Sequence, residues 1–241
     1  MVATRSSRFA CRVNGNWPVI GVIGGRGGSG ASTFAGVLAA VAALGGPALL
    51  VDLDPVAGGI DMLLGIESTP GARWSGVRLD GGRLDPDALV HGLPQWASAA
   101  VLSADVTPAP QAVAGVLDVG ANAGPVVVDL ARCPSAMRDV AVQRCVLVVL
   151  ICGADVRSVM GARAVRRGLD SPRIGLVVVR SGRDPASAAR VAELVEAPLI
   201  GAVSQLRRRD DSPLAVSALP RAMTRVARGV LDAVESLERA A

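Results

Sequence analysis

A glycine-rich segment between two apolar runs constrains the fold of this chain more than any other feature. Residues 22–34 read VIGGRGGSGASTF, with five glycines between positions 24 and 30. The apolar run before them predicts a buried strand, and the Ala/Val/Leu run that starts at Ala31 predicts a helix. Glycines let backbone N–H groups turn inward, and a helix N-terminus adds its positive dipole end. A plain strand-to-helix turn needs only one or two glycines, so the segment favours an anion-binding loop.

The rest of the chain alternates between short apolar runs and Ala-rich helical runs. The runs are continuous rather than alternating, as is typical of parallel strands that are covered on both faces. We therefore predict an α/β fold in three layers, with a doubly wound, mostly parallel sheet of seven to eight strands. The predicted strands are 18–24, 48–54, 99–103, 125–130, 145–152, 174–179 and 199–203, and the predicted helices are 31–44, 109–121, 155–168, 185–196 and 219–239.

The domain organisation follows from the same pattern. Residues 65–98 interrupt the alternation with Gly, Pro and Trp, and we expect an irregular insertion with short helices there. We interpret residues 1–17 as an N-terminal arm and residues 18–241 as one domain.

Composition excludes several kinds of chemistry. All 25 basic residues are arginine, and the chain contains no tyrosine. Schiff-base chemistry and the usual lysine of a phosphate loop are therefore excluded. The five aromatic residues, 2% of the chain, argue against surfaces that stack bases. The four cysteines show no metal-binding spacing, which favours a reducing, cytoplasmic compartment.

Two phosphate-binding patterns fit the glycine-rich segment. Gly25, Gly27 and Gly30 satisfy the dinucleotide pattern G-x-G-x-x-G, with the acidic Asp52 about 22 residues beyond the last glycine. The other pattern is the P-loop, in which lysine and then Ser/Thr follow the last glycine. Here Ala31 takes the lysine position, and Ser32 and Thr33 follow as candidates for Mg²⁺ and phosphate binding.

Aspartates at the ends of two predicted strands separate these interpretations. Asp52 and Asp54 end the run at 48–54, and Asp129 ends the run at 125–130. Nucleotide hydrolases use such a carboxylate to hold Mg²⁺, whereas a dinucleotide fold does not require one. The alternative role for Asp129 is a helix cap, because Pro134 and Ser135 follow it. The three features together favour a nucleotide hydrolase.

The segment from Arg26 to Ser32, RGGSGAS, resembles the deviant phosphate loop K-G-G-x-G-K-[ST] of the MinD/ParA group of SIMIBI-type P-loop ATPases, and the resemblance covers nearly the whole chain. Arg26 stands in place of the signature lysine of that group, and Ala31 in place of the phosphate-loop lysine. Together with ALLVDLDP, VVVDLARCPS and VLVVLICGADVRS, the loop most resembles the CpaE/TadZ subgroup, which positions Tad (Flp-type) pilus machinery. It equally resembles the septum site-determining (Ssd) proteins.

The resemblance implies ATP and Mg²⁺ as cofactors. Asp54 would orient the attacking water, and Arg26 would cross a dimer interface to the partner's nucleotide. Loss of the lysine at Ala31 predicts slow or absent hydrolysis, since it removes a charge beside the phosphates. The implied nucleotide-binding residues are Gly25, Arg26, Gly27, Gly28, Ser29, Gly30, Ala31, Ser32 and Thr33, and the implied Mg²⁺ contacts are Ser32, Asp52 and Asp129.

The same resemblance implies a nucleotide-dependent homodimer with pilus, secretion or cell-division partners. It implies a cytoplasmic protein that partners recruit to the pole, the septum or the inner membrane surface, and we expect the receiver-like upstream domain of the subgroup to be absent. The C-terminal run lacks a Trp/Phe face, so we expect no stable membrane anchor. An asparagine that recognises adenine in the family is missing, because the segment reads Val178-Val179-Arg180-Ser181.

Other interpretations remain open from the sequence. Residues 155–190 hold eight arginines and three aspartates, and Arg207–Arg209 form a run, so a nonspecific DNA-binding surface and an ordinary solvated face are both possible. A pseudo-ATPase scaffold that acts by protein contacts alone is the alternative to a nucleotide switch. An NAD-dependent oxidoreductase is disfavoured, because no substrate domain is apparent.

Overall fold

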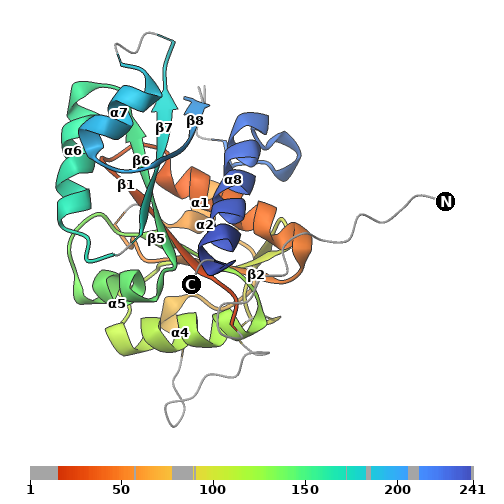
Figure 1. Cartoon of the computed structure of the whole chain (residues 1–241). Helices are drawn as coiled ribbons and strands as arrows, with labels where there is room; N and C mark the ends of the chain where they lie inside the picture. Colours follow the sequence, from red (N-terminus) through yellow and green to blue (C-terminus); the bar gives the residue numbers. More distant parts are fainter. Residues whose placement is uncertain are drawn as a thin grey trace.

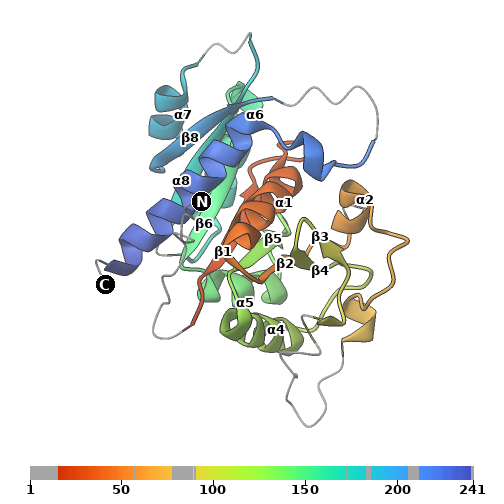
Figure 2. The same cartoon turned by 90° about the vertical axis from the view of Figure 1, so that its right-hand side faces the viewer.

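The computed structural model describes residues 16–56, 58–77, 89, 91–171, 173–182, 186–205 and 212–239. Over this part of the chain an eight-stranded sheet lies between two layers of helices (Figures 1 and 2). The predicted α/β architecture and strand number are thus confirmed. The strands are β1 (Val19–Gly24), β2 (Ala48–Asp52), β3 (Gln95–Trp96), β4 (Ala99–Leu102), β5 (Val126–Leu130), β6 (Leu147–Gly153), β7 (Ile174–Arg180) and β8 (Leu199–Ser204).

The helices alternate with these strands along the chain, and short 3₁₀ segments accompany them. The α-helices are α1 (Ala31–Ala42), α2 (Ile60–Leu64), α4 (Pro110–Ala123), α5 (Ala136–Arg144), α6 (Val156–Arg167), α7 (Ala188–Val195) and α8 (Arg221–Arg239), and the 3₁₀ segments are η1 (Ala43–Gly45), η2 (Trp74–Gly76) and η3 (Val216–Ala218).

The strand order across the sheet is β3-β4-β2-β5-β1-β6-β7-β8, and every neighbouring pair except β3–β4 is parallel. In a dinucleotide-binding sheet of order 3-2-1-4-5-6, the second strand lies directly beside the first. Here β5 separates β2 from β1, so Asp52 lies two strands away from the glycine loop. This topology argues against the dinucleotide interpretation of Gly25, Gly27, Gly30 and Asp52.

Each strand contributes side chains to two separate cores, because successive side chains point to opposite faces of a sheet. Ile20 and Val22 of β1 belong to the core under α1, α2 and α8, whereas Val19 and Ile23 belong to the core under α4, α5, α6 and α7. In β5 the residue pattern places Val127 on the α1 face. Asp129, two residues further, therefore lies on that same face.

Helix α1 explains the long uncharged stretch around residues 27–51. Nine of its twelve residues are buried, from Phe34 to Ala42, so the helix is apolar because it packs against the sheet and α8. Within the described part of the chain, no helix combines the length and the apolar character needed to cross a membrane.

Three of the α-helices and strands, α2, α5 and β3, were not predicted from the sequence, and α2 lies just before the expected insertion. Helix α5 follows its N-cap Ser135, whose side chain accepts a hydrogen bond from the Arg138 N–H. Its inward residues include the charged Arg138, which weakens the apolar pattern. Ser135, not Asp129, is therefore the cap of this helix. Strand β3 has only two residues and pairs antiparallel with β4, which is too short for a sequence pattern.

The start of the glycine loop packs directly against the backbone of α6. A Cβ built on Gly161 would lie 2.4 Å from the carbonyl oxygen of Gly25, and a Cβ on Gly25 would lie 2.8 Å from the Cβ of Ala162. Such distances are far inside van der Waals contact. Gly25 and Gly161 thus permit a close approach of loop and helix that no side chain would allow.

We predict opposite effects for two glycine-to-alanine substitutions in helices. Gly161→Ala should lower the free energy of unfolding by roughly 1–3 kcal/mol, because the new methyl group meets the Gly25 carbonyl. Gly229→Ala in α8 should raise it by up to about 1 kcal/mol, since no heavy atom lies within 4 Å of the new Cβ and alanine is the better helix former. Urea denaturation followed by circular dichroism measures both, and equal effects would contradict the close contact.

Candidate functional site

The glycine loop connects β1 to α1 in a conformation that only glycine adopts easily. Gly28 and Gly30 have φ angles of +72° and +85°, and a Cβ on either would meet no heavy atom within 4 Å. The backbone conformation, not lack of space, therefore selects glycine here. Gly30 is the N-cap of α1 and offers no side-chain acceptor, and the first turn of α1 holds no acidic residue. The first N–H groups of α1 are thus available to an anion.

Asp129 lies at the end of β5, where the Ser32 side chain in the first turn of α1 is close enough to influence its pKa. Only 4% of Asp129 is exposed. The strand register pairs Asp129 with Asp52 of β2, so two carboxylates lie side by side on neighbouring strands. The pKa of Asp129 is raised to about 8, mainly by burial and also by the charges of Asp52 and Asp54, while the Ser32 side chain acts in the opposite direction. The predicted pair of Mg²⁺ contacts, Ser32 and Asp129, is thus brought together.

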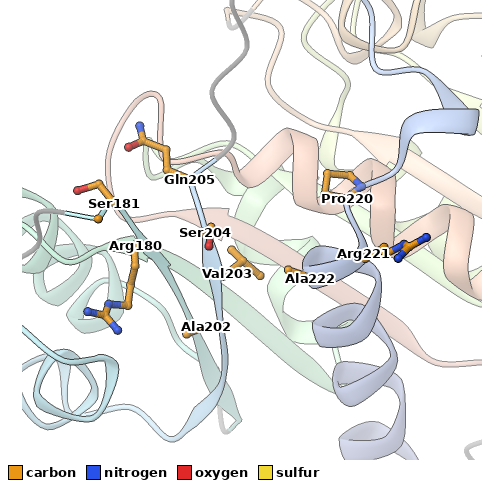
Figure 3. A pocket seen from close by; sticks show the side chains of 10 residues that line it. Arg180, Ser181, Ala202, Val203, Ser204, Gln205, Pro220, Arg221 and Ala222 are labelled. Carbon is orange, nitrogen blue, oxygen red and sulfur yellow. The ribbon is translucent and has the colours of Figure 1, made fainter.

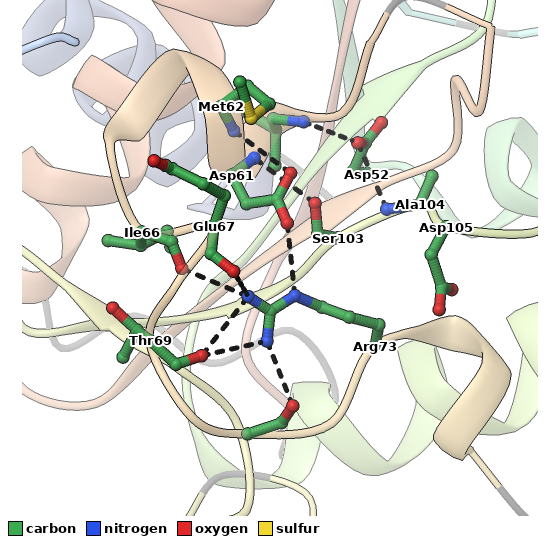
Figure 4. A network of polar contacts seen from close by, with 12 residues as sticks. Asp52, Asp61, Met62, Ile66, Glu67, Thr69, Arg73, Ser103, Ala104 and Asp105 are labelled. Carbon is green, nitrogen blue, oxygen red and sulfur yellow. Dashed lines mark hydrogen bonds and ion pairs between the residues drawn. The ribbon is translucent and has the colours of Figure 1, made fainter.

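The carboxylate of Asp52 accepts hydrogen bonds from backbone groups of three segments, and Figure 4 shows the one from Ala104. It accepts hydrogen bonds from the N–H groups of Asp54 at 2.9 Å, Ile60 at 2.9 Å and Ala104 at 3.2 Å. Burial raises the pKa of Asp52, although these three N–H groups act in the opposite direction. Asp52 therefore joins the segment after β2, the start of α2 and the end of β4. Its role as a Mg²⁺ contact stays a prediction.

A second network of hydrogen bonds, centred on Arg73, holds the segment that follows α2 (Figure 4). The Arg73 guanidinium donates to the Asp61 carboxylate at 3.2 Å and to backbone carbonyls at 3.0–3.4 Å. The Asp61 N–H donates to the Ser103 hydroxyl, and the Trp74 indole N–H donates to the Asp52 carbonyl at 2.8 Å. The carbonyls that accept from Arg73 belong to Ile66, Glu67, Thr69 and Gly71. The described part of the insertion is thereby attached to the ends of β2 and β4.

Two cavities lie over the ends of β6, β7 and β8, on the side of the glycine loop opposite to Asp52 and Asp129. One of about 480 Å³ is lined by loop residues from Arg26 to Thr33 and by the segment 153–155 after β6. A neighbouring cavity of about 870 Å³ is lined by Arg180, Ala202–Gln205 and the start of α8, with Arg180 and Arg221 on opposite sides of β8 (Figure 3). Ser181 and Gln205 line both cavities.

Arg26, the predicted cross-dimer residue, makes an ion pair within its own chain. Its Nη1 lies 3.5 Å from the Asp155 carboxylate, and both side chains are half exposed. Asp155 also caps α6, where it accepts hydrogen bonds from the N–H and the hydroxyl of Ser158. The Ser158 side-chain hydrogen bond, reinforced by Arg26, lowers the pKa of Asp155. The pair therefore connects the loop to the N-terminus of α6.

Not all predicted residues have the same surroundings. Arg26, Gly28, Ser29, Gly30 and Thr33 line the smaller cavity, whereas Gly25 packs against α6. Among the described residues, no group of three or more His, Cys, Asp or Glu is arranged to hold a metal ion.

Sequence reasoning missed three residues near the loop. Arg132, on the segment after β5, has its Nη1 3.6 Å from the position of a Cβ on Gly27. Asp155 and Ser158 were overlooked because they form the capping pair of α6 and only the fold brings them to the loop. A D-x-x-S pattern at the start of a predicted helix was the available signal.

The arginine-rich surface is partly neutralised. Arg163 and Arg166 both contact the Glu196 carboxylate, at 3.3 Å and 3.6 Å. Arg207–Arg209 lie outside the described residues, as do the N-terminal arginines. The described arginines thus provide less free positive charge than their number in the sequence indicates.

Fold and loop together define the class of the chain: it has the fold of the MinD/ParA group of P-loop ATPases. A ParA family ATPase from Chlorobium tepidum TLS superposes with a TM-score of 0.74 at 14% identity, over 91% of this chain and 98% of that one. The septum site-determining protein MinD from Pyrococcus horikoshii OT3, complexed with Mg-ADP, superposes with a TM-score of 0.70 at 16% identity, over 91% of this chain and 96% of that one.

Among individual proteins, this chain is similar to the uncharacterized proteins Rv3660c and MT3760 of two Mycobacterium tuberculosis strains, H37Rv and CDC 1551. Each is 42% identical over 195 residues, which covers 77% of this chain and 54% of the relative. The chain therefore spans about half the length of the curated relatives it matches. No family model matches the sequence.

We predict that Asp52 matters more for stability than its neighbour Asp54. Asp52→Ala should lower the free energy of unfolding by roughly 2–4 kcal/mol, because it leaves buried N–H groups without an acceptor. Asp54→Ala should cost less than about 1 kcal/mol, since Asp54 is only half-buried and accepts one long bond from the Val56 N–H, at 3.3 Å. Urea denaturation measures both, and a larger loss for Asp54→Ala would contradict the assignment.

We also predict a pH-dependent stability effect at Asp129. Its pKa is raised in the folded chain, so the folded state keeps a proton that the unfolded chain releases above about pH 4. The stability that this proton contributes is complete below that pH and is lost as the pH rises towards 8. Asp129→Asn should therefore raise the free energy of unfolding at pH 8, by on the order of 1–2 kcal/mol, and much less at pH 5.

The measurement is urea unfolding at both pH values with a metal chelator present. Asp232→Asn, on the exposed surface of α8, is the matched control and should change stability equally at both pH values. A stabilisation by Asp129→Asn that is the same at pH 5 and pH 8 would contradict the raised pKa.

Proposed function

We propose that the chain binds Mg-ATP at the glycine loop and acts as a nucleotide-dependent switch of the MinD/ParA type, with slow or absent hydrolysis. The observation that carries the proposal is the approach of the Ser32 side chain, in the first turn of α1, to the buried Asp129 carboxylate at the end of β5. A hydroxyl and a carboxylate in this arrangement are the protein contacts that a P-loop gives to Mg²⁺.

The two sides of the glycine loop differ in character, and this difference supports one orientation of the bound nucleotide. The acidic side chains Asp52, Asp54 and Asp129 lie on the side of β2 and β5, and the cavities lie on the side of β6, β7 and β8. A bound cation belongs near the carboxylates, so the outer phosphates would lie over β5. The nucleoside would then extend into the cavities. Ser181 and Gln205, which line both cavities, are the candidates for polar contact with the base, in place of the family's asparagine.

Ala31 is the reason to expect little hydrolysis. A lysine there would place a charge beside the outer phosphates, where transition-state charge develops, and contacts of this kind are worth several kcal/mol. Asp54 is half-buried near Asp129 and is the candidate for orienting water. Binding itself depends mainly on the N–H groups of the loop and on Mg²⁺, so it can persist without the lysine.

Arg26 supports a nucleotide-dependent homodimer. Its ion pair with Asp155 is half exposed and 3.5 Å long, and such pairs contribute little to stability. The guanidinium can therefore leave Asp155 for the phosphates of a partner subunit's nucleotide, as the signature lysine of the family does. The exposed apolar residues Val156 and Met160, on the first turns of α6 beside Asp155, would be covered by such a partner.

The biological role that we propose is septum-site determination, or polar localisation of a Tad-type pilus or secretion assembly. The support is the resemblance of the loop and of the β2, β5 and β6 motifs to the CpaE/TadZ and Ssd proteins. The pseudo-ATPase scaffold remains the second candidate, because Ala31 and the engagement of the Asp52 carboxylate by backbone N–H groups both fit a chain that does not hydrolyse nucleotide.

Calorimetric titration with Mg-ATP tests the proposal, with light scattering to measure mass before and after nucleotide. We expect binding, and a doubling of mass. Ser32→Ala should weaken Mg-ATP binding about tenfold, since it removes a metal contact. Ser236→Ala, whose hydroxyl bonds a carbonyl of its own helix in α8, is the control and should bind as the unmodified chain does.

No binding of Mg-ATP at millimolar concentration would overturn the switch and leave the scaffold. Binding of NAD instead of Mg-ATP would overturn both the nucleotide switch and the pseudo-ATPase scaffold.

A further inference from the structure

The segment after β5 brings an arginine to the glycine loop. The Nη1 atom of Arg132 lies 3.6 Å from the place where a Cβ would stand on Gly27, and apart from Gly27 and its two chain neighbours no other described heavy atom comes within 4 Å of that place. Gly27 lies in the stretch whose backbone forms the anion cradle. The guanidinium is therefore near enough to share an anion with the loop.

The backbone that carries Arg132 is held in place. The buried Arg138 donates one hydrogen bond to the Arg132 carbonyl at 3.1 Å and another to the Gly168 carbonyl at 3.0 Å. Arg138 is only 3% exposed, and Ala131, before Arg132, is also buried. The segment is thus attached to the end of α6, while the Arg132 side chain remains exposed.

The charge of Arg132 is not neutralised within the described part of the chain. The ion pairs found there use other arginines, and no hydrogen bond of the Arg132 side chain is found. Arg26, by contrast, is paired with Asp155. A guanidinium presents five donors in a planar fork that matches phosphate oxygens.

Arg132 also lies on the side of the loop that faces away from the cavities. It follows Asp129 by three residues on the β5 side, and it does not line the cavity that Arg26 lines. If the nucleoside occupies the cavities, the outer phosphates come to the side of Asp129 and Arg132.

We propose that Arg132 supplies, from the segment after β5, the positive charge on the outer phosphates of the nucleotide that Ala31 does not supply. The inference rests on the proposed binding of Mg-ATP. Arg132 is a nucleotide-binding residue in this proposal. It approaches the phosphates from the strand side of the loop, whereas a lysine at position 31 would approach from α1.

Calorimetry of four variants with Mg-ATP tests this: Arg132→Ala, Ala31→Lys, the double variant, and Arg228→Ala. Arg228 is exposed on α8 and provides the same loss of charge away from the loop. Arg132→Ala should weaken Mg-ATP binding at least tenfold, as a lost charge-assisted hydrogen bond does, and Arg228→Ala less than twofold. In the Ala31→Lys background, Arg132→Ala should cost less than threefold, because the lysine then provides the charge.

The outcomes separate this inference from the proposed function. If the unmodified chain does not bind Mg-ATP, the proposed function fails first and the inference fails with it. If the unmodified chain binds Mg-ATP and Arg132→Ala binds equally well, only the inference is overturned. An undiminished loss in the Ala31→Lys background also overturns it, since Arg132 would then not replace the lysine. Thermal unfolding of each variant checks that the fold is retained.

Discussion

Two carboxylates at the ends of neighbouring parallel strands determine how the functional edge of this sheet is built. The register places Asp52 directly beside Asp129, and both are buried. Two adjacent buried negative charges would be unfavourable, and the chain resolves this in two ways. Asp52 accepts hydrogen bonds from three backbone N–H groups, while the pKa of Asp129 is raised, so that Asp129 binds its proton more tightly. Asp52 is thereby used to hold loops, whereas no backbone N–H group is found to bond the Asp129 carboxylate in the described part of the chain.

This difference organises the surrounding segments. Because Asp52 binds the start of α2 and the end of β4, the insertion is attached to the sheet beside the carboxylates. The Arg73 side chain then donates hydrogen bonds to backbone carbonyls of the segment after α2 and so holds that segment in a compact turn. On the other flank, Arg138 attaches the segment after β5 to the end of α6. The glycine loop is therefore bordered by backbone that buried charged side chains hold in position.

The sequence predicted the parts of the fold and site that depend on local pattern. The apolar runs identified seven of the eight strands, and the glycine spacing identified the turn at Gly28 and Gly30, because both are properties of a few consecutive residues. Helix α5 was not predicted, because it is short and directs the charged Arg138 inward. The surroundings of Asp52 and the position of Arg132 depend on contacts between segments that are distant in the chain, and a single sequence carries no signal for them. The local pattern placed Asp52 and Asp129 at strand ends, yet only the register showed that they are adjacent.

The contact between Gly25 and Gly161 has a consequence for how such chains can diverge. Backbone touches backbone there, so neither position tolerates a side chain while the other segment keeps its place. The shape of the loop therefore depends on a glycine on a distant helix, independently of the residue at position 31. A lineage that loses its phosphate-loop lysine can still preserve this pair, because the pair maintains the architecture and not the reaction. Small residues at both positions would then identify distant members whose loop motif has degenerated beyond recognition.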